Sequence, residues 1–296
     1  MKLRELGEDR LIAQLVARLP SRPDVAAGPG DDCAVLKGPG KDRLLLFKTD
    51  CVVEGVHFQA DEKPAAVGWK AMARTLSDFA AMSGLPHFAL VTLIAPPDRE
   101  ARWVKGIYRG LERVADRFNV AIVGGETSGT EGPVVISISA LGSVEKDRSV
   151  SRRGGKGDDA LFVTGRLGGA LRSKHLRFIP RIEEARWLTA HFRIHAMMDL
   201  SDGLGADLPR LAKGSGVGFE IEEAALPRKA GSSVEQAIND GEDYELLFAL
   251  SPNDARRLEE KWRHKFPRLP LTRIGHLTRH ASPMTRHSLH GYRHFE

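Results

Sequence analysis

Cysteines and long apolar runs are both scarce in this sequence. Its 296 residues include two cysteines, Cys33 and Cys51, too few for a disulfide framework or a cysteine-rich zinc site. No apolar run approaches the roughly 20 residues that a membrane-spanning helix needs. The N-terminal segment is charged and lacks the apolar core of a secretory signal. We therefore expect a cytoplasmic protein with no membrane partner.

The motifs of the common nucleotide-binding folds are also missing. The sequence contains no G-x-x-x-x-G-K-[ST] loop and no kinase G-x-G-x-x-G with its partner motifs. The glycine-rich, basic stretch SRRGGKGDD at 151–159 matches neither pattern. If the protein binds ATP, it uses another architecture.

The charge balance is basic, with a formal net charge of +5 at pH 7. Much of the basic character lies late in the chain, from Arg273 onward. A nucleic-acid-binding protein would combine such charge with interleaved aromatic residues and a recognisable motif, and neither is evident here. A basic surface also suits anionic metabolites such as nucleotides. We expect small-molecule partners and no nucleic acid.

Helical and strand-like patterns are mixed along the whole chain, which is typical of an α+β protein. The patterns predict helices over 8–19, 64–82, 98–118, 183–195, 202–214 and 252–264. They predict strands over 33–36, 43–58, 87–95, 120–125, 133–144, 160–165, 218–222 and 244–250. A polar, glycine-rich stretch begins near 148, as in a domain linker. We expect two domains, 1–148 and 149–296.

Carboxylates recur where an apolar segment meets a turn or a helix. Each alone is explained equally well as a turn residue or a helix cap. Asp199 or Ser201, for example, could cap a helix that begins near 202. If Asp199 and Asp202 are both helical, their spacing places them on one face. The recurring acids are Asp31, Asp32, Asp50, Asp78, Glu126, Asp199, Asp202, Glu242 and Asp243.

Taken together, these acids indicate phosphoryl transfer. Converging carboxylates hold Mg²⁺, which keeps part of its water shell and bridges phosphate oxygens. Such ions neutralise the charge that develops on the transferring group, and positioning of the reactants does the rest. The sequence therefore predicts a magnesium site that serves a phosphorylated substrate.

Seven motifs occur in order along the chain. They are GPGDDCAVL (28–36), TDCVVEGVHF (49–58), GWKAMARTLSDFAAMSGLP (68–86), GGETSGT (124–130), MMDLSDGLGADL (197–208), DGEDYELLFAL (240–250) and GYRHF (291–295). Their number and order resemble the thiamine-monophosphate kinase family. That family shares a superfamily with aminoimidazole ribonucleotide synthetase and selenophosphate synthetase. The resemblance runs nearly end to end.

The resemblance implies a fold and a reaction. The fold is the two-domain architecture of aminoimidazole ribonucleotide synthetase. Its N-terminal α/β domain pairs its sheet in a homodimer, and its C-terminal α/β domain completes the active site. The reaction is the phosphorylation of thiamine monophosphate to thiamine diphosphate by direct in-line transfer from ATP. The resemblance also implies several Mg²⁺ ions.

The resemblance also implies roles for single residues. The metal-binding positions match Asp32, Thr49, Asp50, Asp78, Asp199 and Asp202, and Glu126 stands where the family has a metal-binding Asp. Asp32, Asp50, Asp78 and Asp202 are the expected catalytic residues. Nucleotide contacts match Gly125, Glu126, Arg152 and Ser201, and substrate contacts match His57, Glu242 and Leu289. From the residues alone, Arg152 could equally be a solvated linker arginine, and His57 a satisfied, half-buried histidine.

Several positions depart from the family pattern. They are Lys48 in place of Ser or Thr, Thr75 in place of Asn, Glu126 in place of Asp, Asp240 in place of Gly, and Leu289 in place of an aromatic residue. Lys48 either replaces the charge of one cation or points away from the site. These departures leave two alternatives open: a relative that uses ATP on a different small substrate, or a catalytically impaired ATP-binding protein.

Overall fold

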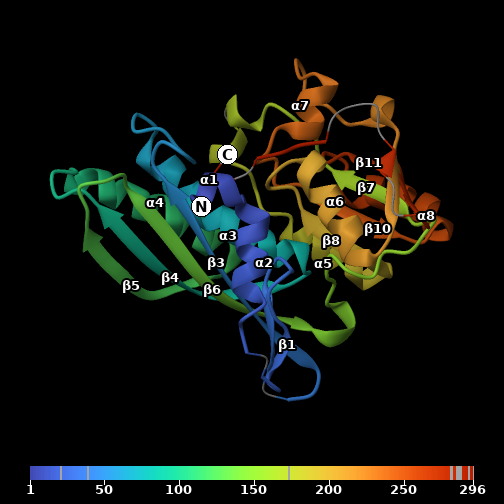
Figure 1. The fold of residues 1–296 in the computed structure, drawn as a ribbon, viewed down its shortest axis with the longest axis horizontal. Helices are drawn as coiled ribbons and strands as arrows, with labels where there is room; N and C mark the ends of the chain where they lie inside the picture. Colours follow the sequence, from blue (N-terminus) through green and yellow to red (C-terminus); the bar gives the residue numbers. More distant parts are fainter. Residues whose placement is uncertain are drawn as a thin grey trace.

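A computed structural model describes residues 1–20, 22–38, 40–172, 174–280, 283–284, 289–292 and 294–295. Arg293 of the GYRHF motif lies outside these ranges, as does part of the basic stretch that begins at Arg273. Figure 1 shows two sheet-and-helix halves joined side by side, with the N-terminal half in blue to green. Within the described ranges, no helix combines the length and apolar character needed to cross a membrane.

The first sheet uses residues 25–145 and has the order β1-β2-β3-β6-β4-β5. Its strands are β1 (Val25–Ala27), β2 (Ala34–Lys37), β3 (Arg43–Val53), β4 (Leu85–Ala95), β5 (Ala121–Gly129) and β6 (Val135–Glu145). Neighbouring strands are antiparallel, except that β4 and β5 are parallel. β3 pairs with β6 without a register shift from Arg43 to Val53. This pairing fixes which side chains of β3 point to each face.

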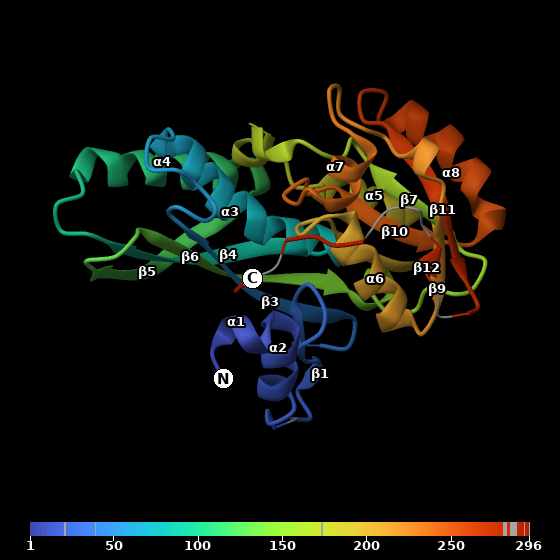
Figure 2. The same ribbon diagram turned by 45° about the horizontal axis from the view of Figure 1, so that its top comes forward.

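Helices α3 (Pro64–Ala81) and α4 (Ala101–Phe118) cover one face of this sheet (Figure 2). Gly68 permits their close contact, because a Cβ at this position would lie 2.0 Å from the carbonyl oxygen of Ile107. The other face of the sheet is open and carries apolar side chains. Its exposed members are Phe47, Phe88, Leu90 and Val123.

The second sheet has the order β12-β9-β11-β7-β10-β8. Its strands are β7 (Ala160–Thr164), β8 (Ile194–Asp199), β9 (Gly218–Ile221), β10 (Leu246–Leu250), β11 (Leu271–Thr278) and β12 (Pro283–Met284). The other helices are α1 (Leu3–Leu6), α2 (Glu8–Val16), α5 (Ile182–His191), α6 (Leu204–Ser215), α7 (Val234–Asn239) and α8 (Pro252–Lys265). Short 3₁₀ turns lie at Lys146–Arg148, Ala170–Arg172, Lys174–Leu176 and Glu223–Ala225.

Both faces of the second sheet are buried. In β10, Phe248 packs into the core that includes residues of α5 and α8, whereas Leu247 packs into the core that includes residues of α6 and α7. A strand with both faces covered reads as a continuous apolar run, as 246–250 does. Helix α3 links the two halves, because it packs on the first sheet and also contacts α5 and β8.

Most predicted elements are present, with corrections at their boundaries. The prediction for 252–264 is confirmed as α8, but α2 ends at Val16 rather than 19, and α4 begins at Ala101 rather than 98. The helix predicted over 183–195 ends at His191, because the buried apolar residues that follow belong to β8. The strand predicted over 43–58 ends at Val53.

The strand predicted over 120–125 is longer than expected. Strand β5 continues through both glycines to Gly129. A Cβ at Gly125 would lie 1.8 Å from the carbonyl oxygen of Val91, so this position needs glycine for close pairing with β4. The two sheets lie on either side of residues 146–159, and the domain boundary at 148 stays a prediction.

Candidate active site

Three carboxylates from distant parts of the chain meet beside α3. Asp32 lies in the loop before β2, Asp78 on α3, and Asp199 at the end of β8. One oxygen atom from each lies within 4.8 Å of the other two, and all three residues are buried. The Ser77 hydroxyl donates a 2.5 Å hydrogen bond to Oδ2 of Asp199, which joins α3 to β8 at this carboxylate cluster.

Burial and mutual repulsion raise the proton affinity of the cluster. Burial raises the pKa of Asp199 to about 7, and Asp32 adds to the rise. Burial also raises the pKa of Asp78 well above its usual range, with Asp50 and Asp199 adding to it. Among the described residues, Oδ2 of Asp32 and Oδ2 of Asp50 are buried without a hydrogen-bond partner. This donor set suits a hard divalent cation such as Mg²⁺.

Lys48 and Asp50 project from the same face of β3 toward the cluster. The Lys48 ammonium nitrogen lies 2.8 Å from Oδ1 of Asp78 and 3.8 Å from Oδ1 of Asp50. Burial lowers the pKa of Lys48, but the two carboxylates outweigh burial and the net shift is upward. The alternative in which Lys48 points away from the site is therefore wrong.

Arg152 connects the segment between the two sheets to the Asp31–Asp32 turn. Its guanidinium donates a 2.5 Å hydrogen bond to Oδ1 of Asp32, and its backbone N–H donates to Oδ1 of Asp31 at 3.2 Å. Oδ1 of Asp31 also accepts from the backbone N–H of Asp32 at 3.0 Å, so Asp31 shapes the turn. The side chain of Arg152 is 19% exposed, so the alternative of a solvated linker arginine is wrong.

Asp202 is not part of the carboxylate cluster. Its carboxylate pairs with Arg210, which also donates to Oδ1 of Asp207 at 2.9 Å. Asp199 lies in a strand and Asp202 in the turn after it, so the helical condition for a shared face is not met. The N-cap of α6 is Gly203, without a side-chain cap, so neither Asp199 nor Ser201 caps this helix.

A small cavity of about 110 Å³ lies beside Asp202. The backbone of Glu242 and Tyr244, which line it, has φ values of 65° and 50°, a region that residues with a side chain rarely adopt. Backbone hydrogen bonds from Glu242 to Ser201 (2.7 Å) and from Tyr244 to Leu200 (2.8 Å) hold this conformation. The polar and aromatic residues of its wall are His57, Arg74, Ser201, Asp202, Glu242, Tyr244 and Tyr292.

The Glu242 carboxylate is held by two buried side chains. Lys70 is fully buried and donates to Oε2 of Glu242, while Nδ1 of His175 lies 3.1 Å from the same oxygen. Burial raises the pKa of Glu242, but His175 and Lys70 outweigh burial and the net shift is downward. Glu242 therefore presents an ionised carboxylate to the small cavity.

His57 is buried in the wall of the same cavity. Its Nδ1 accepts a 3.1 Å hydrogen bond from the backbone N–H of Val53, which leaves Nε2 to carry the proton of the neutral ring. Burial lowers the pKa of His57 to about 4, and Arg74 adds to this effect. His57 is thus a hydrogen-bonded, buried histidine that also lines a cavity. The alternative of a satisfied histidine is therefore compatible with the expected substrate contact.

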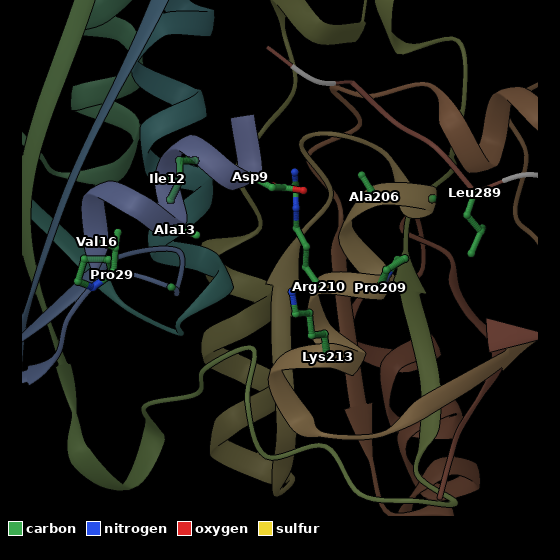
Figure 3. A pocket seen from close by; sticks show the side chains of 12 residues that line it. Asp9, Ile12, Ala13, Val16, Pro29, Ala206, Pro209, Arg210, Lys213 and Leu289 are labelled. Carbon is green, nitrogen blue, oxygen red and sulfur yellow. The ribbon is translucent and has the colours of Figure 1, made fainter. Parts of the chain in front are cut away.

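A large cavity of about 450 Å³ lies between α2 and α6 (Figure 3). Ile12 and Val16 of α2 form an apolar wall, and Arg210 and Lys213 of α6 supply positive charge. Gly30, two residues before Asp32, also lines it. The large cavity therefore reaches the loop that carries the first carboxylate of the cluster.

Leu289 lines the large cavity. The structure therefore does not bring it together with His57 and Glu242, the other expected substrate contacts, which line the small cavity. Tyr292 is the C-terminal residue that reaches the small cavity. Its backbone N–H donates a 3.0 Å hydrogen bond to the carbonyl oxygen of Asp202.

Three of the predicted site residues lie apart from the carboxylate cluster of the same chain. They are Thr49, Gly125 and Glu126. Thr49 points to the open face of the first sheet, where its hydroxyl accepts a 3.0 Å hydrogen bond from Ser139. Gly125 and Glu126 lie on the edge strand β5, which β4 and β6 separate from β3. Among the described residues, the group of carboxylates that could hold a metal ion consists of Asp32, Asp78 and Asp199.

Sequence reasoning missed several residues that surround the site. Two of them, Lys70 and Arg74, lie on α3 before the predicted Asp78. The spacing of four residues between successive members places all three on one helix face. This spacing was a usable signal in the sequence. His175 and Arg210 carried no comparable signal, because their partners are set by the tertiary fold.

Comparisons with known proteins give the family. Residues 30–144 match the family model "AIR synthase related protein, N-terminal domain", and residues 122–282 match "AIR synthase related protein, C-terminal domain". The chain is 40% identical to the thiamine-monophosphate kinase of Rhodopirellula baltica, with 90% of this chain and 88% of that protein covered. It is 36% identical to that of Aquifex aeolicus, with 93% and 92% covered.

A solved structure described as AaThiL complexed with AMPPCP and TMP matches with a TM-score of 0.86 and 33% identity, covering 99% of each chain. The expected two-domain α+β fold of the superfamily is confirmed by this match and by the two family models. The chain belongs to the thiamine-monophosphate kinase family of the AIR synthase related proteins.

Proposed function

We propose that this protein transfers the γ-phosphoryl group of ATP to thiamine monophosphate, which yields thiamine diphosphate. Its relatives are thiamine-monophosphate kinases, and the similar AaThiL structure contains AMPPCP, an ATP analogue, and TMP. The observation that carries the proposal is the carboxylate cluster of Asp32, Asp78 and Asp199. Its residues come from three of the motifs that resemble the family.

Asp32, Asp78 and Asp199 would hold magnesium, with Asp50 beside them. The unpaired, buried oxygens of Asp32 and Asp50 support this assignment. When bound, magnesium neutralises negative charge on the phosphate oxygens. Several ions require ligands beyond the cluster, for which the family resemblance offers Thr49, Asp202 and Glu126.

We assign one substrate to each cavity, and the small cavity, at about 110 Å³, has room for only part of the acceptor. We assign the nucleotide to the large cavity, where an apolar wall suits the base and Arg210 and Lys213 suit phosphate oxygens. Arg152 and Ser201 would add further nucleotide contacts.

We assign the acceptor to the small cavity, where the ionised Glu242 suits the cationic thiazolium ring. The Asp202–Arg210 pair lies between the cavities, since Asp202 lines one and Arg210 the other. We propose direct in-line transfer between the two substrates.

We further propose a homodimer that pairs the open faces of the first sheet. Exposed Phe47, Phe88, Leu90 and Val123 support this arrangement, because a contiguous apolar patch marks an interaction surface. We assign the dimerisation role to residues 1–148, with residues 149–296 as the second domain. We also propose a cytoplasmic location.

The proposal is tested by incubating purified protein with ATP, Mg²⁺ and thiamine monophosphate and measuring thiamine diphosphate by fluorescence after oxidation to thiochrome. We expect product that depends on all three additions. Magnesium-dependent ATP binding without this product would instead favour the two alternatives, a relative that acts on another small substrate or a catalytically impaired ATP-binding protein. Failure to bind ATP would exclude the kinase and both alternatives.

A further inference from the structure

Arg74 lies on α3 between the two parts of the proposed site. It is four residues after Lys70, which holds Glu242, and four residues before Asp78 of the carboxylate cluster. The three side chains therefore share one face of the helix. Arg74 lines the small cavity, and its Nε lies 3.8 Å from Oδ1 of Asp50. It is thus the cation that joins the acceptor cavity to the cluster.

The guanidinium of Arg74 is poorly satisfied. Its side chain is only 17% exposed, yet it donates no hydrogen bond to any described residue. If Arg74 served to neutralise Asp50, the two groups would form a close, hydrogen-bonded pair, but Oδ2 of Asp50 is also without a partner. Lys70 is different, because its ammonium contacts Glu242, His175 and the carbonyl oxygen of His57. No nitrogen of Arg74 is among the buried, unpartnered atoms of the described residues, so its donors reach the small cavity and are available to a ligand there.

A phosphate monoester has the chemistry that these donors recognise. A guanidinium is always charged and can bind two phosphate oxygens through its planar fork. The rest of the wall suits a ring system, with His57, Tyr244 and Tyr292 around the ionised Glu242. A ligand with a phosphate at Arg74 and a ring near Glu242 would place the phosphate next to Asp50 and the cluster.

We propose that Arg74 binds the phosphate of the acceptor substrate and sets the enzyme's preference for a phosphorylated acceptor over the free alcohol. This inference rests on the proposed function. Arg74 would hold the accepting phosphate beside Asp50, in position for transfer from a nucleotide. The family resemblance assigns no role to this position.

The test is equilibrium binding of thiamine monophosphate and of thiamine to the full-length protein by calorimetry, in the presence of Mg²⁺. Arg74→Gln should weaken binding of the monophosphate about 10- to 100-fold, the loss typical of a charged hydrogen bond, and leave binding of thiamine unchanged. Arg74→Lys keeps the charge without the fork and should lie between. The matched control is Arg102→Gln, on an arginine side chain that is 85% exposed on α4, and it should change neither value.

The outcomes separate this inference from the function on which it rests. Equal affinity of wild-type protein and Arg74→Gln for the monophosphate would overturn the role of Arg74 and leave the kinase proposal standing. Equal weakening for thiamine and its monophosphate would show a structural role and would also overturn it. Failure of the wild-type protein to bind the monophosphate would overturn both. If Arg74→Gln does not fold, as judged by its circular dichroism melt, the comparison is made with Arg74→Lys.

Discussion

The ammonium nitrogen of Lys48 lies 2.8 Å from Oδ1 of Asp78, across the contact between β3 and α3. Lys48 thus places a fixed positive charge against a carboxylate that would also hold a metal ion. The same nitrogen lies 3.8 Å from Asp50. The family pattern has Ser or Thr at this position. Lys48 therefore balances the negative charge of Asp78 and Asp50 with an ammonium group that Ser or Thr would not supply.

Lys48→Ser is therefore expected to strengthen binding of a divalent cation. Two unit charges 4 Å apart interact by about 4 kcal/mol at an effective dielectric constant of 20, so removal of the ammonium should raise affinity at least about tenfold. Mn²⁺ binding followed by electron paramagnetic resonance measures this directly. Lys37→Ser, at an exposed lysine of β2, is the control. Unchanged Mn²⁺ affinity in Lys48→Ser would show that Lys48 and the cation do not compete.

Asp78→Asn should remove turnover without loss of the fold. The change deletes one charge of the cluster, and loss of comparable transition-state electrostatics lowers kcat by about 10²- to 10³-fold. The metal-free variant should still fold, because Asp50, 3.8 Å from Lys48, remains as a partner for the ammonium and the repulsion from Asp50 and Asp199 is relieved. Steady-state kinetics and calorimetric melts check both statements. The control is Asp116→Asn, at an exposed position of α4, which should behave as wild type. Retained activity in Asp78→Asn would show that Asp78 is not part of the active site.

His57 should contribute to acid sensitivity. Burial lowers its pKa to about 4, below the value of 6.5 that applies in the unfolded chain. Between these pH values the unfolded chain binds more protons, so the free energy of unfolding rises as the pH rises from about 4 to about 6.5. The contribution of one histidine is at most about 3 kcal/mol.

Urea unfolding at about pH 5 and about pH 7.5 measures this effect. His57→Gln should show a smaller difference between the two pH values than the wild type. The exposed histidine His264, on α8, supplies the control variant His264→Gln, which should keep the wild-type difference. The same difference in His57→Gln and wild type would mean that other groups cause the acid sensitivity.

The open face of the first sheet should hold two subunits together. Val123→Arg places a charge at a side chain that is 58% exposed in the single chain, and burial of an unpaired charge in an interface is costly. Sedimentation velocity should show a dimer for the wild type and a monomer for Val123→Arg. Leu15→Arg alters an equally exposed leucine on α2 and should leave the dimer intact. A monomeric wild type, or a dimeric Val123→Arg, would contradict the proposed interface.

The sequence was sufficient to predict the two-domain fold and the identity of the clustered acids. Asp32, Asp78 and Asp199 stand in motifs, and short apolar runs such as 246–250 marked buried strands. The expectation that the acids lie at element ends is wrong for Asp50, which projects from within β3, and for Asp78, which lies within α3. These two carboxylates reach the site because their side chains project sideways from β3 and α3.

Other features depend on contacts that no local pattern encodes. Lys70 and Glu242 are 172 residues apart, and their pairing follows from the packing of α3 against the second half of the chain. The placement of Asp202 depends on Arg210, which its motif does not include. Glu126 lies on β5 at the far edge of the first sheet, and its role as a metal ligand stays a prediction.

The most direct test of the central claim uses ATP that carries a radioactive phosphorus atom in its γ-position. We expect the label to move to thiamine monophosphate, labelled thiamine diphosphate and ADP to form in equal amounts, and chelation of Mg²⁺ to stop both. Label that passes only to inorganic phosphate, at a rate independent of thiamine monophosphate, would contradict it.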